Sequence, residues 1–247
     1  MEKQYSRRHA LGMIGRGLVA TTLASGLVVV GGCDSHNYDI PKVEISDEER
    51  VLYGPKKSIA LIIDTSGTMD EKVEGIRKLD SAKKSGRTLV DLFYGDKNMR
   101  FNNMGLYDLE GISKVVQVVP IDIIDREKLI KGINSLEIHN LTPIGDAFRR
   151  AKMDLDLTKA GNEYIILLTD GNSNAGNDPF KQLKVIRARD IEYGNKKTKV
   201  FVIPYDMKSK VYEELTKLDV EILPANNEAQ LVGEVTEVGK RIAAEKE

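Results

Sequence analysis

Residues 59–68 read Ile59-Ala60-Leu61-Ile62-Ile63-Asp64-Thr65-Ser66-Gly67-Thr68. The stretch opens with five apolar residues and ends in a carboxylate, hydroxyl groups and a glycine. An apolar run without alternation is typical of a strand that is buried on both faces, as in a parallel sheet covered by helices. The polar residues that follow are then expected in the loop at the carboxyl end of that strand.

The same pattern recurs further along the chain. Apolar runs lie at 164–168 and 200–203, and the first of them ends in Thr169-Asp170-Gly171. Residues 115–119 indicate another strand, and residues 100–109 contain a candidate edge strand. Strands of this kind are short and buried, and each ends where its apolar run gives way to polar residues.

Helical segments separate these strands. They are predicted at 71–93, 126–136, 143–157, 180–191 and 229–242. In the third segment, Thr142 suits the N-cap position and Pro143 the first helical turn. Strands that alternate with helices predict an α/β fold, with a right-handed, doubly wound, mostly parallel sheet flanked by helices.

The composition narrows the classes of function. The chain has 247 residues, of which 41% are hydrophobic and 30% charged, as in ordinary globular proteins. A net charge of −1 and the absence of Trp argue against binding to nucleic acid. One Cys and three scattered His do not form a zinc site by local spacing, so a metal would rely mainly on oxygen ligands.

Residues 1–32 predict a secretory signal. Lys3, Arg7, Arg8 and Arg16 precede an uncharged apolar stretch that ends in small residues. That stretch is shorter than the roughly 20 residues that a spanning helix needs. A removable signal is therefore favoured over a membrane anchor, which remains the alternative.

The end of this stretch, Val30-Gly31-Gly32-Cys33, resembles a bacterial lipobox, in which the cysteine receives a diacylglycerol. The resemblance implies a lipidated N-terminus and tether at 33–57, a domain at 58–247, and a membrane-anchored protein of the cell envelope that faces the periplasm or the exterior. A chance lone cysteine is the alternative.

The export route has its own motif. Ser6-Arg7-Arg8-His9-Ala10-Leu11 resembles a twin-arginine signal, with Ala10 where a bulky residue is usual, and general secretion stays open as the other route. Asp34 resembles an inner-membrane retention signal of some Gram-negative bacteria.

Oxygen ligands gather at the predicted carboxyl ends of two strands. Asp64 and Asp170 each follow an apolar run, and open α/β sheets bind ligands outside the carboxyl ends of their strands. Asp64, Ser66 and Thr68 stand at alternate positions, so in an extended loop their side chains face the same way. Carboxylates and hydroxyls suit a hard cation such as Mg²⁺.

Three segments resemble the metal-ion-dependent adhesion site of the von Willebrand factor type A (vWA) domain. Asp64-Thr65-Ser66-Gly67-Thr68 resembles its first loop, Asp-x-Ser-x-Ser, with Thr68 in place of the last Ser. Residues 141–147 resemble the second loop, and Leu168-Thr169-Asp170-Gly171 resembles the third. The three stand in the family's order, and the resemblance covers residues 58–243.

The resemblance implies a set of ligands for one Mg²⁺, with Mn²⁺ or Ca²⁺ as alternatives. Ser66, Thr68 and Thr142 would bind the ion through hydroxyls, and Asp64 and Asp170 would bind it directly or through water. In the family, an acidic residue of a protein partner supplies the last ligand. An ion held mostly by neutral hydroxyls keeps enough charge to attract that carboxylate.

Local roles are the alternatives for these residues. Thr142 could be only a helix cap, Ser66 and Thr68 could cap a helix that begins near Asp70, and Asp64 could be a turn residue. Residues 170–178 superficially resemble a calcium loop, but the sequence lacks the Gly and Glu that an EF-hand needs at its sixth and twelfth positions.

The leading hypothesis is a protein-binding module that depends on a metal and is not an enzyme. The sequence contains neither a phosphate-binding Gly-x-x-x-x-Gly-Lys-Ser/Thr run nor a Gly-x-Ser-x-Gly elbow, and His139 is a lone loop histidine. The alternatives are an accessory subunit of an ATPase or of a metalloenzyme-maturation assembly, and a metal-dependent hydrolase.

Overall fold

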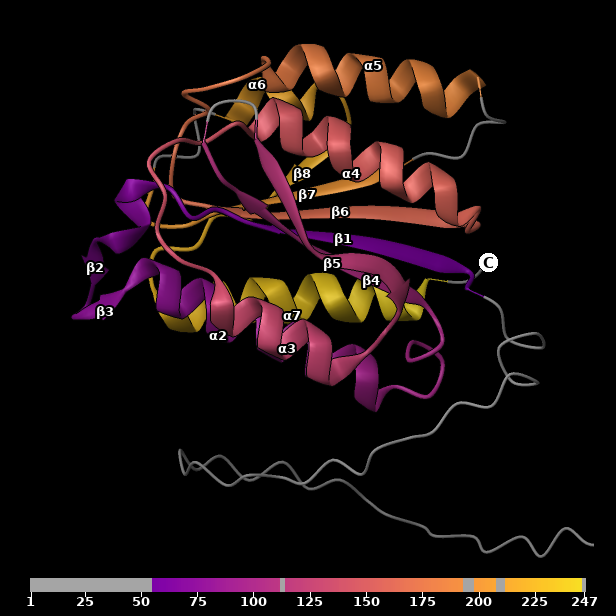
Figure 1. Cartoon of the computed structure of the whole chain (residues 1–247), viewed down its shortest axis with the longest axis horizontal. Helices are drawn as coiled ribbons and strands as arrows, with labels where there is room; N and C mark the ends of the chain where they lie inside the picture. Colours follow the sequence, from indigo (N-terminus) through magenta and orange to yellow (C-terminus); the bar gives the residue numbers. More distant parts are fainter. Residues whose placement is uncertain (1–54, 112–113, 193–197, 208–211, 246–247) are drawn as a thin grey trace, which may run out of the picture. The chain divides into compact units, whose positions relative to one another are not determined.

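The computed structural model describes residues 55–111, 114–192, 198–207 and 212–245 (Figure 1). The predicted signal at 1–32, the export and retention motifs, Cys33 and the tether up to residue 54 lie outside the described residues. Among the helices that the structure describes, none combines the length and the apolar character needed to cross a membrane.

A six-stranded mixed sheet forms the centre of the fold, in the order β5-β4-β1-β6-β7-β8. The strands are β1 Lys57–Ile63, β4 Asn103–Leu109, β5 Val115–Ile123, β6 Asn162–Thr169, β7 Lys199–Pro204 and β8 Val220–Ile222. All neighbours pair in parallel except β4 and β5, which are antiparallel. The predicted doubly wound, mostly parallel α/β sheet is confirmed.

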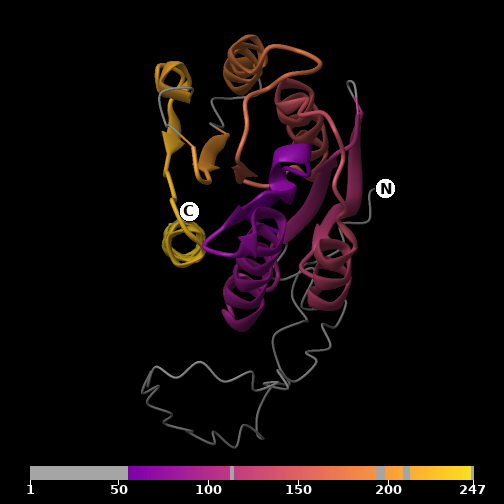
Figure 2. The same ribbon diagram turned by 90° about the vertical axis from the view of Figure 1, so that its left-hand side faces the viewer.

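Helices cover both faces of the sheet (Figures 1 and 2). One layer consists of α2 Lys78–Gly95, α3 Arg126–Ser135 and α7 Glu228–Ala244, and the other contains α4 Ile144–Thr158, α5 Pro179–Glu192 and the short α6 Glu213–Thr216. These bounds confirm the predicted helices at 126–136, 143–157, 180–191 and 229–242 to within two residues. The short elements β8 and α6 were not predicted.

Strand β1 shows why its sequence does not alternate between apolar and polar residues. All seven of its residues are buried. Ala60 and Ile62 belong to the core that α4 covers. On the opposite face, Leu61 and Ile63 lie against Gly86 of α2, where an added Cβ would stand 3.1 Å from Ile63 Cδ1. A strand between two helical layers has no face left for polar side chains.

The helix predicted at 71–93 was wrong in its first turns. The chain instead forms a 3₁₀ helix, η1 Gly67–Asp70, and then a two-stranded hairpin of β2 Lys72–Val73 and β3 Ile76–Arg77 before α2 begins at Lys78. Glu74 and Gly75 at the hairpin turn have φ of 50° and 85°, which a right-handed helix does not allow. The hairpin therefore separates the first polar loop from α2.

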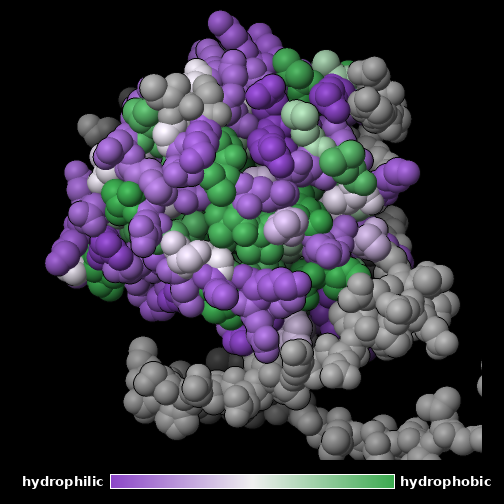
Figure 3. Space-filling view, in the orientation of Figure 1, coloured by the Kyte–Doolittle hydropathy of each residue, from purple (hydrophilic) through white to green (hydrophobic). Residues whose placement is uncertain are grey.

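The edge strand predicted within 100–109 was also wrong in its position. Its residues form β4, which lies between β1 and β5 and is buried throughout. The edge of the sheet is β5, whose residues are half-buried or exposed. Figure 3 shows apolar side chains in the middle of this face, over β5 and between α3 and α4. The antiparallel return of β5 explains why β4 is covered.

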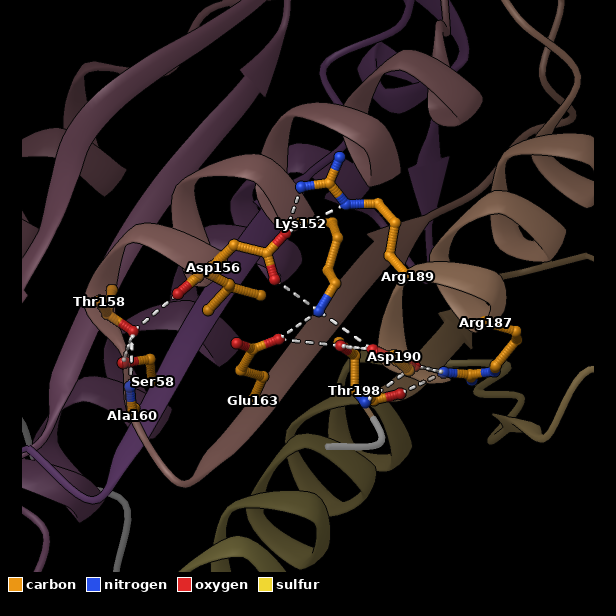
Figure 4. Close-up of polar contacts among 11 residues, drawn as sticks. Ser58, Lys152, Asp156, Thr158, Ala160, Glu163, Arg187, Arg189, Asp190 and Thr198 are labelled. Carbon is orange, nitrogen blue, oxygen red and sulfur yellow. Dashed lines mark hydrogen bonds and ion pairs between the residues drawn. The ribbon is translucent and has the colours of Figure 1, made fainter. Parts of the chain in front are cut away.

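A buried cluster of charges lies at the amino ends of β6 and β7 (Figure 4). Lys152 of α4 is 2% exposed, and its Nζ lies 2.7 Å from Glu163 Oε2 and 3.0 Å from Asp190 Oδ1. The Thr198 hydroxyl lies within hydrogen-bonding distance of both carboxylates, 2.9 Å from Glu163 Oε2 and 2.8 Å from Asp190 Oδ1. The cluster joins α4, β6, α5 and the start of β7. It lies where these strands begin, at the end of the sheet opposite the loops that follow the strands.

Candidate metal centre

Asp64 lies where β1 ends, and it is held by β6. Its N–H donates to Leu168 O over 2.9 Å, so β1 stays paired with β6 up to this residue. Its carboxylate is fully buried, with Oδ1 accepting from Ser66 N at 2.8 Å and Oδ2 accepting from the Thr169 hydroxyl at 2.5 Å. The aspartate is therefore fixed by its own loop and by the last residue of β6.

Burial of the Asp64 carboxylate destabilises its charged form. Loss of solvent raises the pKa of Asp64 from 3.8 to about 6, and the nearby charge of Asp170 adds to the rise, against the hydrogen bonds from Thr169 and Ser66. At neutral pH the group still carries a charge that the surrounding protein solvates poorly. A cation next to it would compensate for the lost solvent.

Ser66, Thr68 and Asp170 are joined by hydrogen bonds between their side chains. The Ser66 and Thr68 hydroxyl oxygens are 3.2 Å apart, and Thr68 Oγ1 donates to Asp170 Oδ1 over 2.8 Å. Thr68 and Asp170 are 102 positions apart in the sequence. The parallel pairing of β1 with β6 brings the two loops together, as predicted from their places at the carboxyl ends of the strands.

Three oxygens from the first loop surround one small space beside Gly171. A Cβ placed on Gly171 would lie 3.7 Å from Thr68 Oγ1 and 4.0 Å from both Asp64 Oδ2 and Ser66 Oγ. Glycine leaves this space free of a side chain. One carboxylate and two hydroxyls that converge in this way fit a hard divalent cation, which prefers oxygen ligands and retains some water.

Thr142 is buried and is held by the loop that carries Asp170. Its N–H donates to Asn174 Oδ1 over 2.8 Å, and its carbonyl oxygen accepts from the Ser173 hydroxyl at 3.1 Å. No hydrogen bond within the described ranges joins its hydroxyl to Asp64, Ser66, Thr68 or Asp170. The link from Thr142 to the other four residues therefore runs through the backbone and this loop.

The local roles considered for these hydroxyls are not the ones that they take. Helix α4 begins at Ile144 with Pro143 at the N-cap and no side-chain cap, so Thr142 does not cap it. Ser66 is at the N-cap of η1 but makes no side-chain capping bond there, and α2 begins only at Lys78. The hydroxyls of Ser66 and Thr68 point instead to each other and to Asp170.

Two glycines allow the third loop to lie against the start of α4. A Cβ on Gly145 would overlap the carbonyl of Asn177, and a Cβ on Gly176, which has a φ of 68°, would overlap Asp146. Asp146 is buried and accepts hydrogen bonds from the N–H and the side-chain amide of Asn177. This close packing sets the position of Thr142 relative to the third loop.

His139 lies beside the first loop without joining the oxygen cluster. Its N–H donates to Thr65 O over 2.6 Å, and its Nε2 stands 3.4 Å from Asp108 Oδ2. Asp108 in turn accepts from the Thr65 hydroxyl at 2.5 Å. Burial raises the pKa of Asp108, and the hydrogen bond from Thr65 opposes that rise. This polar group supports the loop from behind.

Lys78 and Thr169 are two contributors to the site that the sequence analysis missed. Lys78 Nζ donates to Asp170 Oδ2 over 3.0 Å, and both side chains are buried. The helix predicted at 71–93 placed Lys78 in its interior, so its position at the start of α2 was not foreseen. Thr169 stood within the third motif, but no hydrogen-bonding role was assigned to it.

The described residues contain no group of three or more His, Cys, Asp and Glu side chains arranged to hold a metal. The cluster at the carboxyl ends of β1 and β6 combines two carboxylates with hydroxyl groups. Its donors are those of a site for a hard cation, and they differ from the thiolate and imidazole donors of zinc sites.

Sequence comparison identifies the part of the chain that carries these loops. Residues 59–172, which extend from β1 to the loop after β6, match the family described as the von Willebrand factor type A domain. This segment is similar to a vWA domain. The first two loops of the oxygen cluster lie within the matched residues, and the match ends inside the third loop, after Asp170.

A curated relative of the chain comes from Bacillus subtilis. It is the uncharacterized protein YwmD, which is 26% identical over 182 residues, covering 69% of this chain and 79% of the relative. The similarity therefore extends over most of both proteins.

Solved structures share the fold at low sequence identity. The pilus adhesin SpaC from Lactobacillus rhamnosus GG superposes with a TM-score of 0.61 at 13% identity, over 76% of this chain and 30% of the adhesin. The vWF domain of the type V pili tip protein Mfa5 from Porphyromonas gingivalis gives a TM-score of 0.57 at 12% identity, over 78% and 97% of the two chains. This chain thus spans less than a third of the adhesin.

Proposed function

We propose that the vWA domain binds one divalent cation, Mg²⁺, and uses it to hold an acidic group of a protein partner. The observation that carries the proposal is the convergence of Asp64, Ser66 and Thr68 oxygens around the space beside Gly171. Asp170 is joined to this group through Thr68, and Thr142 is expected to complete it. Mn²⁺ and Ca²⁺ offer the same preference for oxygen.

The balance of charges supports binding of an anion by the loaded site. Hydroxyls of Ser66 and Thr68 are neutral ligands, so they leave the ion most of its charge. Asp170 shares its own charge with the ammonium group of Lys78, 3.0 Å away. An incoming carboxylate can then supply both a ligand and the missing negative charge.

The structural neighbours support a role in binding proteins and not in catalysis. SpaC is a pilus adhesin and Mfa5 a pilus tip protein, and this chain shares their vWA fold. We therefore extend the proposal to a module that acts at the cell envelope. Anchoring through a diacylated Cys33 and exposure to the periplasm or the exterior remain parts of this proposal that rest on the sequence.

The metal is tested by calorimetric titration of Mg²⁺ into full-length protein stripped with EDTA. Wild type should bind one ion, and Ser66→Ala should lose most of that affinity. Thr88→Ala is the matched control, because the Thr88 hydroxyl bonds only to Lys84 O on α2. Equal affinity of wild type and Ser66→Ala, with both folded by circular dichroism, would exclude the site.

The partner is tested by capture from an envelope extract with the full-length protein as bait, in Mg²⁺ and in EDTA, with identification by mass spectrometry. A protein retained only in Mg²⁺, and lost with Ser66→Ala, would support a contact bridged by the ion. Its equal retention in EDTA would place that contact on another face. The dependence on an acidic group would then be checked by replacing partner acids one at a time.

A further inference from the structure

Lys78 places a buried positive charge beside the proposed metal site. It is the first residue of α2, and its side chain is 5% exposed. Its Nζ lies 3.0 Å from Asp170 Oδ2, 2.9 Å from Glu71 Oε2 and 3.2 Å from Asp206 Oδ2. One ammonium group therefore joins the loops that follow β1, β6 and β7.

Asp170 is the partner that matters most in this group. Its side chain is fully buried, whereas those of Glu71 and Asp206 are 63% and 46% exposed and are screened by water. The dipole of α2 disfavours a positive charge at its first residue. The negative charge of Asp170 offsets this unfavourable interaction of the Lys78 ammonium group. Burial lowers the pKa of Lys78, but hydrogen bonds to Glu71 and Asp170 outweigh it and hold the pKa above its ordinary value.

The contact divides the two oxygens of Asp170 between two donors. Oδ2 accepts from Lys78, and Oδ1 accepts from the Thr68 hydroxyl at 2.8 Å. Lys78 thus orients the carboxylate that orients Thr68. It also cancels one of the two negative charges that Asp64 and Asp170 bring to the site.

We propose that Lys78 is a positioning residue that sets the charge of the metal site, weakening its hold on the cation and strengthening its hold on an anionic ligand. The inference rests on the proposed function. With Lys78 present, the two aspartates, one Mg²⁺ and the ammonium group sum to a single positive charge. Without it, the same loaded site is neutral and attracts a carboxylate less.

The first test compares Mg²⁺ affinities of wild type, Lys78→Met and Lys83→Met, each full-length and stripped of metal. Met keeps the apolar stem of the lysine and removes the charge. Lys83 lies on the same helix, and its Nζ donates to Asn134 O, away from the site, so Lys83→Met controls for net charge. We expect Lys78→Met to bind Mg²⁺ roughly tenfold more tightly and Lys83→Met to match wild type.

The second test measures an anionic probe on the protein loaded with Mn²⁺. Trifluoroacetate is a carboxylate whose ¹⁹F relaxation is enhanced when it lies beside bound Mn²⁺. We expect Lys78→Met to lower its affinity severalfold, in the opposite direction to the change in metal affinity. A role of Lys78 in folding alone would not shift the two affinities in opposite directions.

The outcomes separate this inference from the proposed function. Unchanged or weaker Mg²⁺ binding by folded Lys78→Met, with wild type binding normally, would overturn the role of Lys78 and leave the metal site intact. Absence of Mg²⁺ binding by wild type and by both variants would overturn the metal site itself, and the role of Lys78 with it. If Lys78→Met does not fold, Lys78→Gln serves in its place with the same expected directions.

Discussion

The Thr169 hydroxyl donates to Asp64 Oδ2 over 2.5 Å, across two neighbouring parallel strands. Thr169 is the last residue of β6, and Asp64 follows the last residue of β1. The bond ties the orientation of a proposed metal ligand to the register of the sheet. Its geometry depends on the central strands of the fold, and less on the exposed loops.

Thr169→Val is therefore expected to weaken Mg²⁺ binding by about 10-fold or more without unfolding the protein, because groups that orient metal ligands contribute on that scale. Val keeps the shape and β-propensity of Thr. Calorimetric titration measures the change, and Thr88→Val serves as the control. Wild-type affinity in Thr169→Val would show that the bond does not position Asp64.

The stability of the metal-free protein should depend on pH through Asp64. Its pKa in the fold is about 6, above the ordinary 3.8, because the carboxyl group is buried. The folded state therefore binds this proton more tightly than the unfolded state. The stabilising contribution is complete below about pH 4 and is lost as the pH rises through 6.

Asp64→Asn removes that titration. In EDTA, raising the pH from 4 to 7.5 should lower the free energy of unfolding of wild type by about 2–3 kcal/mol more than that of the variant. Urea unfolding at the two pH values measures it. Mg²⁺ at neutral pH should stabilise wild type and leave the variant unchanged. Parallel pH profiles of the two proteins would contradict the assignment.

Asp170→Ala should destabilise the fold for a reason separate from metal binding. It leaves the Lys78 ammonium buried without its principal partner, and loss of one partner of a buried pair costs about 3–5 kcal/mol. The double variant Lys78→Met with Asp170→Ala should recover most of that loss. Urea unfolding of the two single variants and the double variant, all in EDTA, gives the coupling energy; additive losses would contradict it.

Lys152 offers the same kind of test at the other end of the sheet. Its Nζ contacts the carboxylates of Asp156, Glu163 and Asp190 within 3.0 Å (Figure 4). Lys152→Ala should cost about 3–5 kcal/mol of unfolding free energy and leave Mg²⁺ affinity unchanged. Denaturant unfolding and metal titration on the same sample check both. A loss of metal affinity without a loss of stability would be the contrary result.

The hydrophobic pattern of the sequence predicted the strands and helices whose burial follows from neighbouring residues. The apolar run of β1 predicted a central strand, and the polar residues after β1 and β6 predicted a meeting of Asp64, Ser66, Thr68 and Asp170, which hydrogen bonds confirm for these four. Their binding of a metal stays a prediction. Thr142 lies beside the third loop, and its hydrogen bonds to that loop are made by its backbone N–H and carbonyl oxygen.

The features that were missed depend on distant or compensating contacts. Residues 71–77 contain Val73 and Ile76 at a helical spacing, and the turn at Glu74 and Gly75 overrides that periodicity. The role of Lys78 depends on Asp170, 92 positions away, which no local pattern relates to it. The interior place of β4 depends on β5 returning antiparallel beside it.

The two edges of the sheet bear on how the domain behaves when many copies are crowded together. On β5, Pro120 lacks an N–H and Asp122 carries a charge, and both are exposed. The opposite edge, β8, has only three residues. Neither edge offers a long row of backbone groups to a strand of another molecule. Copies concentrated on one surface are therefore protected from pairing through their sheet edges. Contacts between them would be made by side chains.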